Sequence, residues 1–283
     1  MPAEYLPERF KKTLVTSLNT TSYNIPVYIV DSHDPQQEYA NFESKDNRVI
    51  YKEDLVRYTT GRIPLPKYAQ PAGGGDRAFA IYDIATGIMR EYFYAVKDEK
   101  GTWHFAASGY FKAKPNFKDL GKDNFAMQHT TGGSAVVCML NPLSQIGIAE
   151  ARKGEICHAL SFTIANAGKG FSYPAKQGDG TSTNPNAPLE GQWFRIDPNI
   201  DLNKLKLRPF TLLVAKAVQK YGGYAADKNL FCHTFTEHPI NEMAQGKPNP
   251  WEKGGDIYEK YNGIDLNDFP WHLTQWAPVD WGK

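Results

Sequence analysis

The carboxylate of Glu91 lies in an apolar segment where it could act as an acid or a base. It alternates with Met89 and Phe93, so a strand that buries those two side chains would also turn Glu91 inward. A buried carboxylate needs a partner or has a raised pKa, and either property suits a general acid or base. The alternative is that Tyr92 and Tyr94 face inward and Glu91 is solvated.

His158 occupies a similar position in a second apolar segment. It shares one face of the predicted strand 155–164 with Ile156, Leu160 and Phe162. A histidine on such a face is either a neutral core residue with one or two hydrogen bonds, or a site residue at the rim of a sheet. Both interpretations remain open.

Two aspartates could join these residues at one end of a sheet. Asp76 immediately precedes the predicted strand 78–83, and Asp227 follows a helix and its terminating turn. Two carboxylates and a histidine suit glycosidic-bond chemistry, which needs an acid, a base and a proton relay. We therefore take Glu91, His158, Asp76 and Asp227 as candidate catalytic residues and leave open whether the protein is an enzyme.

Aromatic side chains suggest a different role, the binding of a glycan. Sugars lay their apolar ring faces on flat side chains, while polar groups bond the hydroxyls. We take Tyr92, Tyr94, Trp103 and Arg195 as candidate ligand-binding residues. The alternative is that the aromatic residues fill the core.

Neither a metal site nor a cofactor is expected from the sequence. His233 and His238 are five residues apart, which places them on opposite faces of a strand. Cys138, Cys157 and Cys232 form no C-x-x-C pair, so free thiols are favoured, although one disulfide remains possible.

The composition limits the class of protein. The 283 residues carry a formal net charge of +1, which gives no overall electrostatic attraction to nucleic acid or to an acidic membrane. No apolar run is long enough for a membrane span, and no secretory signal is recognisable. An extracellular or virion-surface location would then require a removed signal or another route of release.

Strands dominate the predicted secondary structure. Segments 78–83 and 88–96 form a hairpin, and 102–111 extends it to a meander. One helix is predicted over about 209–221, with Pro209 in its first turn and glycines at its end. The expected fold is mainly β, a jelly-roll-like antiparallel β-sandwich with this one helix packed on it.

Three segments describe the expected organisation. Residues 1–24 form an N-terminal arm, 25–239 a single β-sandwich domain, and 240–283 a Trp- and Pro-rich extension. The extension is expected to pack on the body or on a neighbouring copy, so the termini could mediate homo-oligomer or assembly contacts.

Several short motifs resemble, in order, an uncharacterised family of mostly secreted bacterial β-sandwich proteins associated with polysaccharide or cell surfaces. They are Ile63-Pro64-Leu65-Pro66, Ala72 to Asp76, Thr86-Gly87 with Glu91-Tyr92-Phe93, Trp103, Gly154 to Leu160, Ser172-Tyr173-Pro174-Ala175, and Ala215 to Asp227. The resemblance implies that this chain keeps the family's residues at Glu91, His158 and Asp227. The family's histidines are replaced at Arg77 and at Lys176-Gln177.

Three functions are therefore considered. The first is a non-catalytic, carbohydrate-contacting protein that decorates a virion or cell surface or mediates adhesion, with a polysaccharide or glycan as partner. The second is a glycoside hydrolase or lyase that uses the Glu/His/Asp residues. The third is a structural assembly protein with clasping termini. The missing histidines favour the first.

Overall fold

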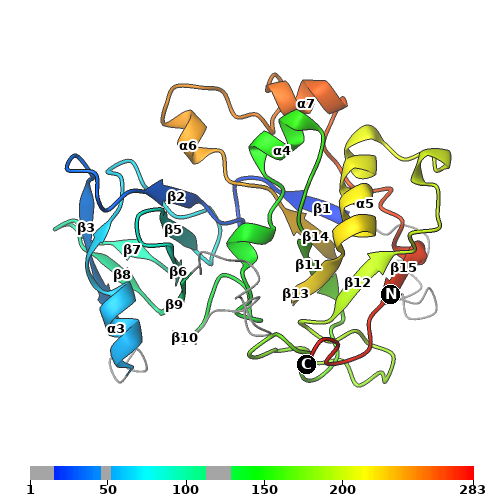
Figure 1. Ribbon diagram of the computed structural model, residues 1–283, viewed down its shortest axis with the longest axis horizontal. Helices are drawn as coiled ribbons and strands as arrows, with labels where there is room; N and C mark the ends of the chain where they lie inside the picture. Colours follow the sequence, from blue (N-terminus) through cyan, green and yellow to red (C-terminus); the bar gives the residue numbers. More distant parts are fainter. Residues whose placement is uncertain (1–15, 46–51, 113–128) are drawn as a thin grey trace. The chain divides into compact units, whose positions relative to one another are not determined.

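The computed structural model describes residues 16–45, 52–112 and 129–283, which divide into two compact units (Figure 1). Unit 1 comprises the chain up to Thr20 together with Leu143–Lys283, and unit 2 comprises Thr21–Pro142. This division differs from the single domain predicted over 25–239. The division falls between Pro142 and Leu143, inside the predicted domain, and the predicted N-terminal arm contributes the strand Thr16–Asn19 to the sheet of unit 1.

Unit 1 is built on a six-stranded sheet in the order β1-β14-β11-β13-β12-β15. Every residue of the strand β11 is buried, as expected for a strand covered on both faces. The strands are β1 (Thr16–Asn19), β11 (Leu160–Ala165), β12 (Trp193–Ile196), β13 (Gly223–Asn229), β14 (Cys232–Phe235) and β15 (Thr274–Trp276).

The helix α5 (Pro209–Tyr221) coincides with the predicted helix and packs beside β11 and β12 (Figure 1). Pro209 occupies its first turn, and Gly222, with a φ of 83°, ends it. The other helical segments of unit 1 are α4 (Ile148–Lys153), η4 (Leu202–Lys204), α6 (Ile240–Met243), α7 (Asp256–Tyr261) and η5 (Trp271–Leu273). The short helix η3 (Asn141–Ser144) spans the division between the units in the chain.

The C-terminal extension packs on its own unit. Trp251 and Trp271 are buried in the hydrophobic core that also contains Phe162 of β11 and Phe210 of α5. The strand β15 pairs with β12 at the edge of the sheet. The extension therefore completes the core of unit 1.

Unit 2 contains two sheets and the helix α3 (Glu53–Thr59). The five-stranded sheet has the order β10-β9-β6-β5-β2, and the four-stranded sheet has the order β4-β3-β8-β7. Their strands are β2 (Val27–Val30), β3 (Tyr39–Ser44), β4 (Gly61–Pro64), β5 (Phe79–Asp83), β6 (Ile88–Phe93), β7 (Val96–Lys97), β8 (Trp103–Phe105), β9 (Ala107–Lys112) and β10 (His129–Thr130).

An aromatic cluster joins the two sheets of unit 2. Phe42 of β3 stacks on Tyr92 of β6, with ring centroids 4.6 Å apart. Trp103 of β8 contacts Phe79 of β5 at 5.2 Å, and Phe105 contacts Tyr92 at 5.0 Å. These rings are buried, and such contacts add to the free energy gained by burying them, so the aromatic cluster contributes to the core of unit 2.

The prediction of a mainly β fold is confirmed, but the sheets are mixed rather than wholly antiparallel. The meander β5-β6-β9 is antiparallel, but the run predicted as one strand over 102–111 divides into β8 of the four-stranded sheet and β9 of the five-stranded sheet. The strand β2 runs parallel to β5, β3 to β8, β1 to β14 and β11 to β13. Parallel neighbours require long crossover connections. The segments 31–78 and 166–222 provide two of them.

Candidate functional site

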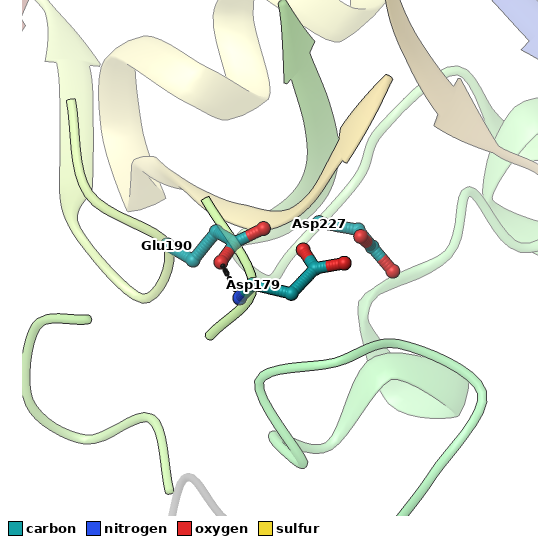
Figure 2. A group of neighbouring side chains, drawn as sticks. All are labelled: Asp179, Glu190 and Asp227. Atoms are coloured by element: carbon teal, nitrogen blue, oxygen red, sulfur yellow. Dashed lines mark hydrogen bonds between the residues drawn. The ribbon is translucent and has the colours of Figure 1, made fainter. Parts of the chain in front are cut away.

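Three carboxylates from distant parts of the sequence meet in unit 1. Asp179 and Glu190 lie in the long connection between β11 and β12, and Asp227 lies in β13 beside Thr163 of β11. One oxygen from each carboxylate lies within 4.8 Å of the others (Figure 2). We call these three residues the acidic cluster.

Glu190 is the buried member of the acidic cluster. Its side chain is completely buried, and its Oε2 accepts hydrogen bonds from the backbone N–H groups of Asp179 (2.6 Å) and Gly180 (3.0 Å). Its Oε1 is also buried and has no hydrogen-bond partner. Burial raises the pKa of Glu190 to about 7, although the two backbone amides favour the carboxylate.

Two glycines allow the backbone to pass close to Glu190. A Cβ at Gly178 would lie 2.6 Å from the Glu190 Oε2, and a Cβ at Gly180 would lie 2.0 Å from the carbonyl oxygen of Gly168. Only glycine fits at such close approaches. The glycines at 178 and 180 therefore allow the Asp179 and Gly180 amides to reach the carboxylate.

A lysine borders the acidic cluster. The Lys228 Nζ lies 2.8 Å from the Asp179 Oδ2, and the Lys228 backbone N–H donates to the Asp227 Oδ1 at 2.8 Å. Asp179 is exposed and Asp227 is half-buried, so the cluster is open on their side. An arrangement of three oxygen donors with one ammonium group can hold a cation or share a proton between carboxylates.

The sequence predicted Asp227 as a site residue but missed its two partners. Asp179 and Glu190 lie in the segment 165–192, whose Gly, Asn, Pro and Ser content indicates only a loop. The available signal is that glycines flank Asp179 on both sides and that Gly191 follows Glu190. Close backbone approach is one reason for such glycines.

His158 pairs with Glu150 rather than with Asp227. Its Nε2 lies 2.9 Å from the Glu150 Oε2, and its Nδ1 lies 2.8 Å from the Ala159 carbonyl oxygen. The strand predicted over 155–164 begins only at Leu160, so His158 precedes β11. In the parallel pair β11/β13, Asp227 is level with Thr163, which lies three residues, or roughly 10 Å, beyond the start of β11. The structure therefore does not bring His158 and Asp227 together.

We expect the ion pair between His158 and Glu150 to stabilise unit 1 in a pH-dependent way. Burial opposes the charge of His158, but the hydrogen bonds to Glu150 and to the Ala159 carbonyl outweigh it and raise the pKa of the imidazole. Its stabilising contribution is complete below pH ~6.5 and is lost as the pH rises through the folded-state pKa. The pKa of Glu150 is lowered, because its hydrogen bonds outweigh its burial, so its contribution is lost only in acid.

The substitution His158→Gln should therefore lower the free energy of unfolding by about 1–2 kcal/mol at pH 6 and by less at pH 9. Urea unfolding at the two pH values measures the difference. An equal loss at both values would mean that only neutral hydrogen bonds are removed.

Glu91 is buried in unit 2, and so is the other face of its strand. The exposed fraction is 1% for Glu91 and 0% for Tyr92, so neither of the two predicted orientations leaves a face solvated. Ala80 and Gly109 lie opposite Glu91 on the neighbouring strands, and the Ser134 backbone N–H donates to its Oε1. Burial raises the pKa of Glu91 to about 7, against the hydrogen bonds from Ser134.

Asp76 and Tyr94 lie next to each other in unit 2. The Tyr94 backbone N–H donates to the Asp76 carbonyl oxygen at 2.7 Å. Burial raises the pKa of the half-buried Asp76 carboxyl. Tyr94 is 50% exposed, and the guanidinium carbon of Arg77 lies 5.5 Å from the centre of its ring.

Tyr92 and Trp103, two of the candidate ligand-binding residues, belong to the core. Both side chains are almost completely buried in the aromatic cluster, and the Tyr92 hydroxyl donates to the Thr59 carbonyl oxygen at 3.1 Å. They cannot contact a glycan in this fold, which favours the core alternative for these two rings. Arg195 is exposed on β12 of unit 1, where its Nε donates to Gln275 at 3.3 Å.

His233 is a buried residue of β14. The His233 Nδ1 lies 2.5 Å from the Thr163 Oγ1, and burial lowers the pKa of His233 to about 4. Cys138, Cys157 and Cys232 form no disulfide with one another, and Cys157 is exposed.

The four candidate catalytic residues are divided between the units: Glu91 and Asp76 belong to unit 2, and His158 and Asp227 belong to unit 1. In the part of the chain that the structure describes, no helix has both the length and the apolar character to cross a bilayer. No family model, no curated protein and no solved structure matches this chain.

Proposed function

We propose that this protein is a non-catalytic, carbohydrate-contacting surface protein that acts outside the cell or on a virion, and that it binds glycans through unit 2. The observation that carries the proposal is that two half-exposed tyrosines are hydrogen-bonded through their backbones to one glycine-rich segment, and we infer that they form one surface. This tyrosine surface consists of Tyr23, the segment Gly73–Gly75, Asp76, Arg77 and Tyr94.

The glycine segment fixes Tyr23. The Tyr23 backbone N–H donates to the Gly73 carbonyl oxygen at 3.0 Å, and the Gly73 N–H donates to the Thr21 carbonyl oxygen at 3.1 Å. The Tyr23 ring packs on Gly74 so closely that a Cβ there would lie 2.7 Å from ring atoms. Tyr23 nevertheless remains 48% exposed.

Residues of the same segment hold Tyr94. Besides the bond from Tyr94 to Asp76, the Ala95 backbone N–H donates to the Arg77 carbonyl oxygen at 3.1 Å. The carbonyl groups that hold Tyr23 and Tyr94 belong to Gly73 and Asp76, which are three residues apart and so lie within ~11 Å of each other. The backbones of the two tyrosines are therefore anchored to neighbouring points of one segment.

Backbone conformation supports a functional role for this surface. Among the described residues, seven non-glycine residues have a positive φ, and three of them are Tyr23 (61°), Arg77 (44°) and Tyr94 (55°). Such conformations are unfavourable for bulky residues and gather where the surrounding structure serves a function. Flat rings beside a carboxyl and a guanidinium group suit a sugar, which has apolar faces and hydroxyl edges.

An array of bacterial polysaccharides and oligosaccharides, followed by calorimetry on the glycan that binds, tests the proposal. We expect Tyr94→Ala and Tyr23→Ala each to weaken binding about tenfold or more, because each removes a ring from the contact. The control is Trp281→Ala, which removes a 59% exposed aromatic side chain from unit 1. Absence of binding across the array, or equal affinity in the tyrosine variants, would refute the proposal.

The contacts of the other candidate residues favour this function over the alternatives. An enzyme that uses Glu91, His158 and Asp76 or Asp227 needs them around one cleft, and the pairing of His158 with Glu150 does not support such a site. Clasping of neighbouring copies by the C-terminal extension is less favoured, because Trp251 and Trp271 are buried in their own unit. We also propose that unit 2 is a small jelly-roll-like sandwich, since its two sheets share the aromatic cluster.

A further inference from the structure

We propose that the acidic cluster of unit 1 binds one divalent cation, and that the cation is Ca²⁺. Asp179, Glu190 and Asp227 each contribute a carboxylate oxygen. Ca²⁺ binds oxygen ligands at about 2.3–2.6 Å, so two ligands on opposite sides of the ion are about 5 Å apart. The separations within 4.8 Å in the cluster are compatible with this geometry.

The orphaned oxygen of Glu190 is a second indication of a ligand. A buried carboxylate oxygen without a partner is unfavourable, and nearly all such groups in folded proteins have one. The Glu190 Oε2 is held by two backbone amides, whereas the completely buried Oε1 has no hydrogen-bond partner. Figure 2 shows this free oxygen on the side that faces Asp179 and Asp227. A cation bound between the carboxylates would satisfy it.

The charges of the cluster match one divalent cation. Three ionised carboxylates together with the Lys228 ammonium leave two negative charges, which one divalent cation neutralises. All three proposed ligands are oxygens, and hard cations such as Ca²⁺ prefer oxygen, whereas zinc and copper prefer nitrogen and sulfur. The flexible coordination of Ca²⁺ also leaves room for backbone carbonyl groups or water as further ligands.

The position of the ligands predicts what the cation would do. Asp179 and Glu190 lie in the connection between β11 and β12, and Asp227 lies in the sheet. A cation would therefore tie this connection to β13. Binding should stabilise unit 1, because the cation would bind the folded chain in preference to the unfolded one.

Thermal unfolding and calorimetry of the full chain, freed of metal with EDTA, test the proposal with Ca²⁺ alone as the probe. We expect about 5 mM CaCl₂, above the ~0.1–1 mM dissociation constants of extracellular calcium modules, to raise Tm by about 3–6 °C. Calorimetry should show one Ca²⁺ bound per chain, because the three carboxylates form one site.

Variants locate the site. Asp227→Asn and the isosteric Glu190→Gln should each weaken Ca²⁺ binding at least tenfold, whereas the control Glu252→Gln, an exposed carboxylate elsewhere in unit 1, should leave it unchanged. An unchanged Tm of the wild-type protein in CaCl₂ would overturn the proposal, whether or not the variants fold. Equal affinity in the cluster variants and the control would overturn it as well, and so would binding of Mg²⁺ in preference to Ca²⁺.

Discussion

Replacing Trp271 with alanine is expected to lower the free energy of unfolding of unit 1 by about 3–5 kcal/mol. The indole is 1% exposed, and its ring centroid lies 4.9–5.4 Å from those of Phe162, Phe194 and Phe269. Its Nε1–H also donates to the Thr16 Oγ1 at 2.7 Å, which ties the C-terminal extension to β1. The substitution would leave a cavity among the rings and an orphaned hydroxyl on β1.

Urea unfolding followed by tryptophan fluorescence is a suitable measurement, because Trp103 is the only one of the six tryptophans that belongs to unit 2. Trp271→Phe should be less destabilising than the alanine variant, since it keeps an aromatic ring and loses the hydrogen bond. Trp281→Ala should change the free energy of unfolding by less than about 0.5 kcal/mol, because that side chain is exposed. Equal effects of Trp271→Ala and Trp281→Ala would show that the extension does not contribute to the core of unit 1.

Elements whose signals are local could be predicted from the sequence. The helix α5 follows from an apolar repeat of 3.6 residues between Pro209 and Gly222. The hairpin β5-β6 follows from two apolar and aromatic runs around the turn that ends at Gly87, whose φ is 65°. In both cases neighbouring residues determine the conformation.

The pairing of distant strands could not be predicted in the same way. The strands β1 and β14 are parallel neighbours although more than 200 residues separate them. Alternation also fails where both faces of a strand are buried. This is why Glu91 and Tyr92, adjacent residues on β6, are both in the interior.

The candidate sites were predicted only in part, for a related reason. Asp227 and Tyr94 are recognisable because each belongs to or adjoins a predicted element. Tyr23 lies in a polar N-terminal segment, and no feature of its neighbours predicts a positive φ or a contact with Gly74. Residues such as Tyr23, Asp179 and Glu190 become site candidates only when the fold brings distant loops together.

The free energy of unfolding of the wild-type protein is expected to fall by about 3 kcal/mol between pH ~4.5 and pH 8, and the substitution Glu91→Gln should abolish this fall. Burial raises the pKa of Glu91 to about 7 in the folded state, compared with 4.5 for a glutamate exposed to water. As the pH rises above 4.5, the unfolded chain therefore loses this proton before the folded chain does. Stability consequently falls until the pH passes about 7, and then levels off.

Urea unfolding followed by circular dichroism, at pH 5 and pH 8, measures this effect as the difference between wild type and variant. The glutamine keeps an oxygen that can accept the Ser134 N–H, so the variant should be stabilised relative to wild type as the pH rises. The raised pKa of Glu190 also lowers the free energy of unfolding as the pH rises. Because Glu190 is present in both proteins, its effect cancels in the difference between them. Glu99→Gln, on an exposed residue of the same unit, should show no such dependence on pH. If wild type and Glu91→Gln differ in free energy of unfolding by the same amount at pH 5 and pH 8, Glu91 ionises in the folded chain as it does in water. That result would contradict the burial of Glu91 between Ala80, Gly109 and Ser134.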